Sequence, residues 1–211
     1  MTFGKRPLTI LLATLAPLTQ TLCASLDSRA LIASLAKPPP AQIEFTEIRF
    51  SPLLDKPLVV SGELGNEGPG ELDRKVRKPY VENTYIRGES VRVERQGEPV
   101  RSFALKRAPE LRSLLTGFSA LLTGDATAVE QSFTISSQGD NAHWSLSLVP
   151  KDPRTRQRLS EVRVNGHQQE PQCFSIINAD GGASIMLLGS AAQVELPIKL
   201  TRDWVEKHCR E

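Results

Sequence analysis

The sequence predicts an α+β fold in which one antiparallel, strongly curled sheet of roughly ten strands or more is covered by helices. Three observations lead to this prediction. From residue 42 onward, segments rich in Val, Ile, Phe and Thr alternate with Gly, Pro, Asn and Asp about every ten residues, as in strands joined by tight turns. Apolar residues at helical spacing interrupt this pattern near the middle. Large sheets curl because strand twist accumulates, so the apolar face needs a cover.

The first element after residue 24 is a predicted helix over residues 25–37. Its apolar residues recur at helical spacings, and Asp27 and Ser28 stand near its start as candidate caps. Six strands are then predicted, at Ile43–Ser51, Leu58–Leu64, Leu72–Val76, Asn83–Arg87, Val91–Arg95 and Val100–Leu105. The residues between them favour turns, at Gly65–Gly70, Gly88–Glu89 and Gln96–Gly97.

A helix over Pro109–Thr123 is expected in the middle of the chain, because its leucines recur every three or four residues. Gly124 ends this helix and Asp125 caps a short second one, reaching about Glu130. A closing helix is expected over Arg202–His208. Five more strands are predicted before it, at Ser132–Ser137, His143–Val149, Leu159–Val164, Cys173–Ile177 and Ser184–Leu188. Turns are predicted between them at Gly139–Asn141, Asn165-Gly166 and Asp180–Gly182.

Residues 1–24 are expected to be a cleaved signal peptide. Lys5 and Arg6 form a positively charged start, and Leu8–Leu22 is a mostly apolar run. Thr, Pro and Gln interrupt this run, whereas a membrane span needs about 20 apolar residues. The alternatives are an uncleaved anchor and a plain N-terminal helix. Export across a membrane is therefore predicted, with residues 25–211 forming a single domain.

The composition excludes some classes of protein. Apolar residues make up 39% and charged residues 24%, as in globular proteins, so a disordered chain is excluded. Aromatic residues make up only 5%, so the core must consist mainly of Leu, Val, Ile and Ala. The net charge of +2 comes from the two basic residues of the leader, since 24 bases and 24 acids remain after it. A neutral domain has no long-range field to attract phosphates, which argues against nucleic acid as a partner.

Two cysteines remain once Cys23 leaves with the leader, and an oxidising compartment favours their pairing. A disulfide between Cys173 and Cys209 would tie the C-terminal segment to a late strand. The alternative is two buried thiols that never meet. No metal site is expected, because no further ligand pattern accompanies the cysteines.

Catalytic motifs are scarce. The three histidines, His143, His167 and His208, are scattered, so we interpret them as solvated or packing residues; a hydrolase that uses one of them is the alternative. The glycine-rich segment Gly62–Gly70 lacks the Lys-Ser/Thr ending and the following helix of a phosphate loop, and a hairpin turn is expected. Glu44 and Glu47 should face opposite sides of a strand and cannot act as a catalytic pair. Neither catalysis nor a cofactor is therefore predicted.

Local basic clusters lie on several predicted strands. Asp73-Arg74-Lys75 is followed by Arg77-Lys78, and Arg101 precedes Lys106-Arg107. Interleaved acids indicate ordinary solvated strand faces. The functional alternative is a docking surface for an acidic partner or for lipid headgroups.

The order of leader, helix, long meander, central helices and returning strands resembles the LolA-like outer membrane lipoprotein carriers, a divergent branch of the LolA/LolB superfamily. The local match covers the Gly-x-Leu segment within Ser61–Asp73, then Lys78-Pro79, then the strand–glycine turn–strand of Asn83–Val93. The chain departs from the family before the turn proline, where Gly68 stands in place of an Arg. The resemblance implies an unclosed β-barrel with a helical lid and an apolar cavity that shields acyl chains.

We therefore expect a non-enzymatic periplasmic carrier that shields a lipid or acylated, lipoprotein-like molecule between the inner and outer membranes. Its partners would be an acyl chain, an inner-membrane exporter and an outer-membrane acceptor, and the carrier itself is expected to be a monomer. The alternative is a periplasmic adaptor that docks on an exporter or on a lipid or polyene assembly system without cargo. The candidate cavity residues are Phe45, Ile48, Phe50, Val60, Leu64, Leu114, Leu115, Phe118, Leu121 and Leu122.

Phe45 and Ile48 raise a question of orientation. Side chains alternate along a strand, so residues three positions apart point to opposite faces. One of these two residues is expected to face outward unless a bulge intervenes.

Overall fold

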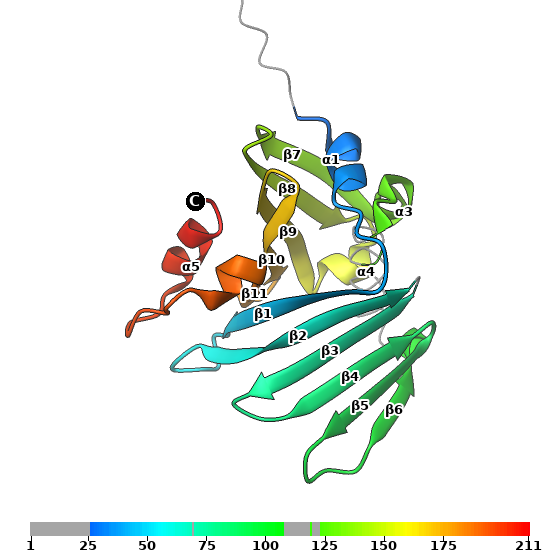
Figure 1. The fold of residues 1–211 in the computed structure, drawn as a ribbon, viewed down its shortest axis with the longest axis vertical. Helices are drawn as coiled ribbons and strands as arrows, with labels where there is room; N and C mark the ends of the chain where they lie inside the picture. Colours follow the sequence, from blue (N-terminus) through cyan, green and yellow to red (C-terminus); the bar gives the residue numbers. More distant parts are fainter. Residues whose placement is uncertain (1–25, 69, 108–118, 120–122) are drawn as a thin grey trace, which may run out of the picture.

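A computed structural model describes residues 26–68, 70–107, 119 and 123–211 of the chain. Its central feature is one antiparallel sheet of 11 strands in the order β6-β5-β4-β3-β2-β1-β11-β10-β9-β8-β7. The sheet curls strongly in space (Figure 1), and among the described residues no pairing joins its end strands β6 and β7. The predicted α+β fold, an unclosed barrel with a helical cover, is confirmed.

The first half of the chain forms a meander of neighbouring strands. These are β1 (Ala41–Phe50), β2 (Leu58–Gly68), β3 (Glu71–Lys78), β4 (Glu82–Arg87), β5 (Ser90–Arg95) and β6 (Arg101–Ala104). The second half forms another meander, whose last strand pairs with β1: β7 (Phe133–Gly139), β8 (His143–Pro150), β9 (Leu159–His167), β10 (Glu170–Asn178) and β11 (Ala183–Leu188). All eleven predicted strands are present, which follows from the regular alternation of β-branched residues with turn residues.

Four α-helices lie in the described part of the chain: α1 (Ser28–Ser34), α3 (Ala126–Ser132), α4 (Pro153–Arg156) and α5 (Arg202–His208). The predicted caps are present, since the Asp27 and Asp125 side chains accept hydrogen bonds from backbone N–H groups at the starts of α1 and α3. Two 3₁₀ turns, η1 (Leu105–Arg107) and η2 (Gly189–Gln193), complete the order. None of the helices in this part of the chain has the length and apolar character needed to cross a membrane.

Strands continue into two of the predicted turns, so the first turn is shorter than predicted and the second prediction is wrong. β2 extends to Gly68 instead of ending at Leu64, and β9 extends to His167 through the predicted Asn-Gly turn. Gly166 is needed as a strand residue: a Cβ atom there would lie 2.2 Å from the ring of Trp144. The glycine therefore makes room for a tryptophan that packs on the sheet.

Both faces of the central strands are buried. The inner face carries the larger apolar cluster, which α1 and α3 cover; we call it the inner cluster. The outer face carries a second cluster, the outer cluster, in which α5 packs on β1, β10 and β11. The inner cluster is built mainly from aliphatic residues with a few aromatic ones: Leu31, Ile32, Leu35, Phe45, Val60, Leu64, Val76, Val129, Phe133, Trp144, Leu146, Leu148, Leu159, Val162, Val164, Phe174 and Leu188.

A disulfide bond joins Cys173 of β10 to Cys209 just after α5, as predicted from the cysteine count. Both half-cystines are buried in the outer cluster, beside Ile185, Leu187 and Val205. The bond links two points 36 residues apart in the sequence. It therefore holds the C-terminal helix on the outside of the sheet.

Candidate functional site

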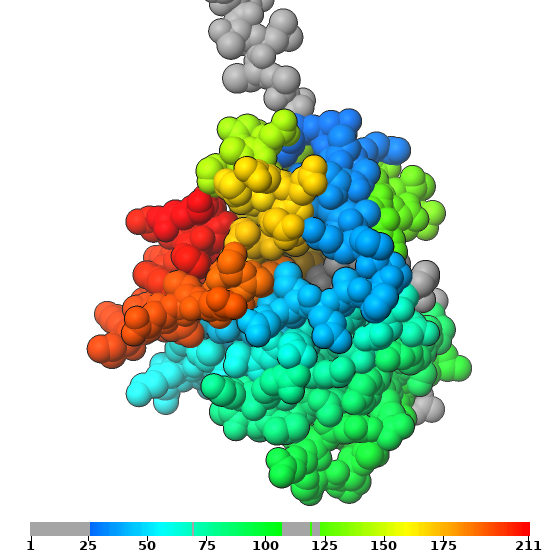
Figure 2. All heavy atoms as spheres, viewed as in Figure 1, coloured from blue at the N-terminus to red at the C-terminus, as the bar shows by residue number. Residues whose placement is uncertain are grey.

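A hollow of about 430 Å³ opens at the edge of the inner cluster. We call it the apolar hollow. Figure 2 shows an opening here, between the blue segment that leads into β1 and the yellow-to-orange β9–β10 hairpin. Its lining comes from both halves of the sheet and from the end of α1: Leu35, Lys37, Ala41, Gln42, Ile43, Leu64, Gly65, Asn66, Leu72, Val164, Glu170, Pro171, Phe174, Leu188 and Gly189.

Strand pairing explains why the walls of the apolar hollow are apolar. Ile43 of β1 stands directly opposite Leu64 of β2, and directly paired residues point to the same face of a sheet. From the other half of the sheet, Phe174 of β10 stands opposite Val164 of β9. The hollow is thus enclosed by inward-facing aliphatic and aromatic side chains that belong to, or border, the inner cluster.

Polar groups lie around the same space. Lys37 Nζ donates a hydrogen bond to Glu170 Oε1 at 2.8 Å, linking the segment after α1 to β10. Both side chains are partly exposed, at 41% and 61%. An exposed ion pair contributes only about 0–1 kcal/mol, so this link between the α1–β1 segment and β10 can open at small cost.

The structure places the predicted cavity residues of the first two strands on different faces. Phe45, Val60 and Leu64 lie in the inner cluster, and Leu64 lines the apolar hollow. Ile48 and Phe50 belong to the outer cluster, so their assignment to the cavity wall is corrected. The reason is the alternation of side chains along β1 without a bulge: the pairing with β2 is regular from Ala41 to Arg49. Leu114, Leu115, Phe118, Leu121 and Leu122 lie outside the described residues.

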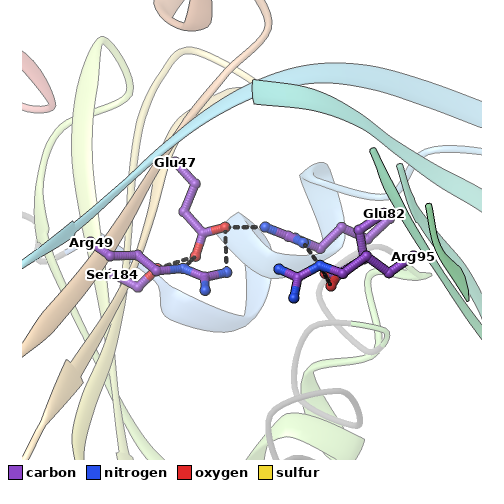
Figure 3. A network of polar contacts seen from close by, with 6 residues as sticks. Glu47, Arg49, Glu82, Arg95 and Ser184 are labelled. Atoms are coloured by element: carbon purple, nitrogen blue, oxygen red, sulfur yellow. Dashed lines mark hydrogen bonds and ion pairs between the residues drawn. The ribbon is translucent and has the colours of Figure 1, made fainter. Parts of the chain in front are cut away.

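A buried charged group lies further along β1 on the inner face (Figure 3). The Glu47 carboxylate accepts hydrogen bonds from Arg49 Nε at 2.7 Å and Arg49 Nη2 at 3.1 Å. It also accepts hydrogen bonds from Arg74 of β3 and from the hydroxyl group of Ser184 of β11. The Glu47 side chain is only 6% exposed and that of Arg74 only 17%. The network therefore joins three strands of the sheet through one carboxylate.

The partners of Glu47 decide its ionisation state. Burial alone would raise the pKa of the carboxyl group, but the hydrogen bond from Arg49 and the positive charge of Arg74 lower it to about 2. Glu47 is thus a fixed anion at neutral pH. A carboxylate with this pKa is unsuited to proton transfer near neutrality, because catalytic groups work best with a pKa near the operating pH.

The network continues outward across the first meander. Arg74 lies 3.8 Å from Glu82 of β4, and Glu82 lies 3.5 Å from Arg95 of β5. The Arg95 guanidinium also lies over the ring of Tyr80, 4.5 Å from its centroid. Arginine and glutamate alternate along this series, so each buried charge has an opposite charge beside it.

The predicted solvated basic cluster is therefore corrected at Arg74. This side chain points inward, and its guanidinium lies 5.1 Å from the centroid of the Phe45 ring. Its neighbour Lys75 points outward and lies 3.7 Å from Asp73. An adaptor surface built on Arg74 and Lys75 together is not available, because alternation places them on opposite faces of β3. The sequence gives no local signal for the network, since Glu47 and Arg74 are 27 positions apart.

The three histidines gather at a second cavity, of about 760 Å³, on the outer face of the sheet. His143 and His167 stand opposite each other on β8 and β9, with ring centroids 4.8 Å apart, and His208 of α5 lines the same cavity. The histidines are scattered in the sequence but lie around one cavity in the structure, since β8 pairs with β9 and α5 packs nearby. Within the described residues, no group of three or more His, Cys, Asp or Glu side chains could hold a metal ion.

The two acidic residues of β1 face opposite sides, as predicted. Glu47 points inward, whereas Glu44 is exposed and its Oε2 accepts a hydrogen bond from Gln193 Nε2 at 3.2 Å. They do not form a catalytic pair. The inner face therefore carries both an apolar hollow and a buried carboxylate that is paired with arginines.

Comparisons with known proteins gave a family match and matches to solved structures. A family model described as outer membrane lipoprotein carrier protein LolA-like matches residues 20–210. A search of curated proteins found no match. Among solved structures, a LolA superfamily protein from Nitrosomonas europaea is 11% identical, with 86% of this chain and 99% of that chain covered and a TM-score of 0.42. A DUF1329 family protein from Desulfovibrio piger is 12% identical, with 87% and 96% covered and a TM-score of 0.41.

Proposed function

The chain belongs to the outer membrane lipoprotein carrier protein LolA-like family, and from this premise we propose that it is a non-enzymatic periplasmic carrier. Its cargo would be a lipid or another acylated molecule in transit between the inner and outer membranes. The acyl chain would enter the apolar hollow and extend along the inner cluster. An exporter in the inner membrane and an acceptor in the outer membrane would be the partners of this transit.

The observation that carries the proposal is the apolar hollow at the edge of the inner cluster. Its volume of about 430 Å³ lies within the range of about 300–1,000 Å³ that small-molecule pockets have. Burial of a methylene group is worth about 0.8 kcal/mol, so an acyl chain of about 14 carbons could gain roughly 10 kcal/mol. Ordering of the chain and opening of the walls would reduce this gain, which keeps binding reversible.

The arrangement of polar groups supports a carrier without catalysis. Glu47 is held ionised by arginines, and its pKa of about 2 lies far from the range of a general acid or base at neutral pH. The three histidines line the outer cavity, across the sheet from the apolar hollow. A ligand in the hollow would therefore meet mainly hydrocarbon.

The proposed location rests on the leader pattern and the disulfide. Residues 1–24 have the charged start and apolar run of a signal peptide. The Cys173–Cys209 bond suits an oxidising compartment such as the periplasm. Both features agree with transit between two membranes.

Binding of a fluorescent fatty acid to the mature protein tests the proposal. Ile43→Glu places a charge in the wall of the apolar hollow, and we expect affinity for the probe to fall at least tenfold. The matched control is Val149→Glu, a substitution of a 37% exposed residue of β8 that does not line the hollow. The control should bind as the wild type does. Denaturation curves of both variants would show whether the fold is kept, and a wild-type protein that binds no acyl probe would refute the carrier function.

A further inference from the structure

Two loops present strongly exposed apolar tips. The β1–β2 loop, residues 51–57, carries Leu53 at 93% exposure and Leu54 at 49%. The segment 195–200, which follows η2, carries Ile198 at 110%. Leu53 and Ile198 are the two most exposed large apolar side chains in the described part of the chain. Single exposed leucines are ordinary, but a group of them at one edge indicates an interaction site.

The two loops rise from one place on the molecule. Phe50 and Val59, at the base of the first loop, pack against the outer cluster, and so do Leu196 and Leu200 on either side of Ile198. Figure 1 shows both loops projecting from the same edge, in cyan after β1 and in orange to red before α5. The tips therefore belong to one surface, which we call the apolar edge.

The first tip is a defined turn. Leu54 N–H donates to the Ser51 carbonyl at 3.0 Å, and Leu53 N–H donates to the Ser51 hydroxyl at 3.2 Å. Prolines stand in both loops, at positions 52, 57 and 197, and fix one backbone angle each. The structure holds Leu53 out in solvent although the outer cluster lies at the base of the loop. Removal of this apolar tip from water would lower the free energy.

We propose that the apolar edge is a contact site for the interfacial region of a lipid bilayer. The charges of the two loops indicate whether electrostatic attraction or apolar burial would drive this binding. The first loop carries Asp55 and Lys56, and the second carries Glu195 and Lys199, so each loop is neutral overall. Electrostatic attraction to anionic headgroups is therefore not the driving force, and the tips enter the bilayer surface by burying apolar side chains.

The apolar edge is separate from the apolar hollow. The loop of residues 51–57 follows the last residue of β1, whereas the hollow is lined by the first residues of that strand, Ala41–Ile43. A membrane contact at the edge leaves the hollow's lining untouched. The inference goes beyond the proposed carrier function and can hold or fail independently of it.

Flotation of the mature protein with vesicles tests the site. We expect wild-type protein to float with phosphatidylcholine vesicles and to bind equally well when a quarter of the lipid is phosphatidylglycerol. Raising the salt concentration should change binding less than twofold. The double variant Leu53→Ser, Ile198→Ser should bind about a hundredfold more weakly, since each large aliphatic side chain contributes about tenfold.

The matched control is Val100→Ser, which removes a 54% exposed apolar side chain between β5 and β6. The control should float as the wild type does, and all variants should keep the wild-type affinity for an acyl probe if the carrier function holds. If the wild type floats with vesicles but does not bind the acyl probe, the carrier function is overturned and the membrane site is not. Three results would overturn the membrane site: no flotation of wild type, undiminished flotation of the double variant, or binding only to anionic vesicles at low salt. In those cases the edge is not a lipid contact, and a protein partner would have to cover it.

Discussion

Replacement of Glu47 by Gln tests how the inner polar network stabilises the fold. The substitution keeps the shape of the side chain and removes its charge, which leaves Arg74 buried beside a neutral group. Removal of one partner of a buried ion pair usually costs about 3–5 kcal/mol. Glu63 of β2 provides a matched control, since it is 31% exposed and pairs with Arg77 at 2.6 Å. Glu63→Gln should cost less than about 1 kcal/mol.

The pKa of Glu47 gives a second, independent value for the contribution of this carboxylate to the free energy of unfolding. It lies at about 2 in the folded protein, against 4.5 for the ordinary group. Since a tenfold change in proton affinity is worth about 1.4 kcal/mol, the ionised carboxylate contributes about 3 kcal/mol to stability at neutral pH. A lowered pKa in the folded state means that this stability is present above pH 4.5 and is lost as the pH falls toward 2. Below that range the carboxyl group is protonated in both states and contributes nothing.

Urea denaturation between pH 7 and pH 2, followed by tryptophan fluorescence, measures both effects. The free energy of unfolding of Glu47→Gln should lie about 3 kcal/mol below that of wild type at pH 7, and the difference should shrink as the pH falls from 4.5 toward 2. The Glu63→Gln difference should stay small throughout. A Glu47→Gln difference that is as large at pH 2 as at pH 7 would refute the electrostatic account and indicate a packing defect instead.

Two further predictions concern covalent and backbone constraints. Cys173→Ser with Cys209→Ser should lower the free energy of unfolding by about 2–4 kcal/mol, and a reducing agent should lower wild type equally while leaving this variant unchanged; equal stability of the two oxidised proteins would contradict this. Gly62→Ala should lower the melting temperature by at least several degrees, because its Cβ atom would lie 1.9 Å from the Lys75 carbonyl oxygen, whereas Gly68→Ala, with nothing within 4 Å, should leave it nearly unchanged in the same thermal scan. Equal melting temperatures for the two alanine variants would show that β2 and β3 can separate locally.

The strands could be predicted because each one carries its own local signal. Runs of β-branched and apolar residues between turn residues give eleven strands, and capping aspartates such as Asp27 and Asp125 mark helix starts. Glycines predicted the turns less reliably. A glycine also occurs within a strand where a neighbouring group occupies the space that a side chain would fill. Gly166 under Trp144 is such a case, and there the strand continues.

The faces and the polar network could not be predicted in the same way. Glu47 and Arg74 meet only because β1, β2 and β3 pair in one register, and no spacing within a strand records that pairing. The same is true of His143 and His167, which lie 24 positions apart and face each other across β8 and β9. Ile48 shows the opposite difficulty: an apolar residue does not tell which of two buried faces it occupies.

The disulfide bond in the outer cluster affects how easily the sheet can change its curvature. A disulfide bond joins the residue after the C-terminal helix to β10, and Val205 of this helix is buried in the same cluster as Ile185 of β11 on the convex side. The packed convex side therefore resists flattening of the central strands. Under the proposed carrier function, side chains on the concave side would then rearrange around a ligand while the convex side keeps the sheet bent.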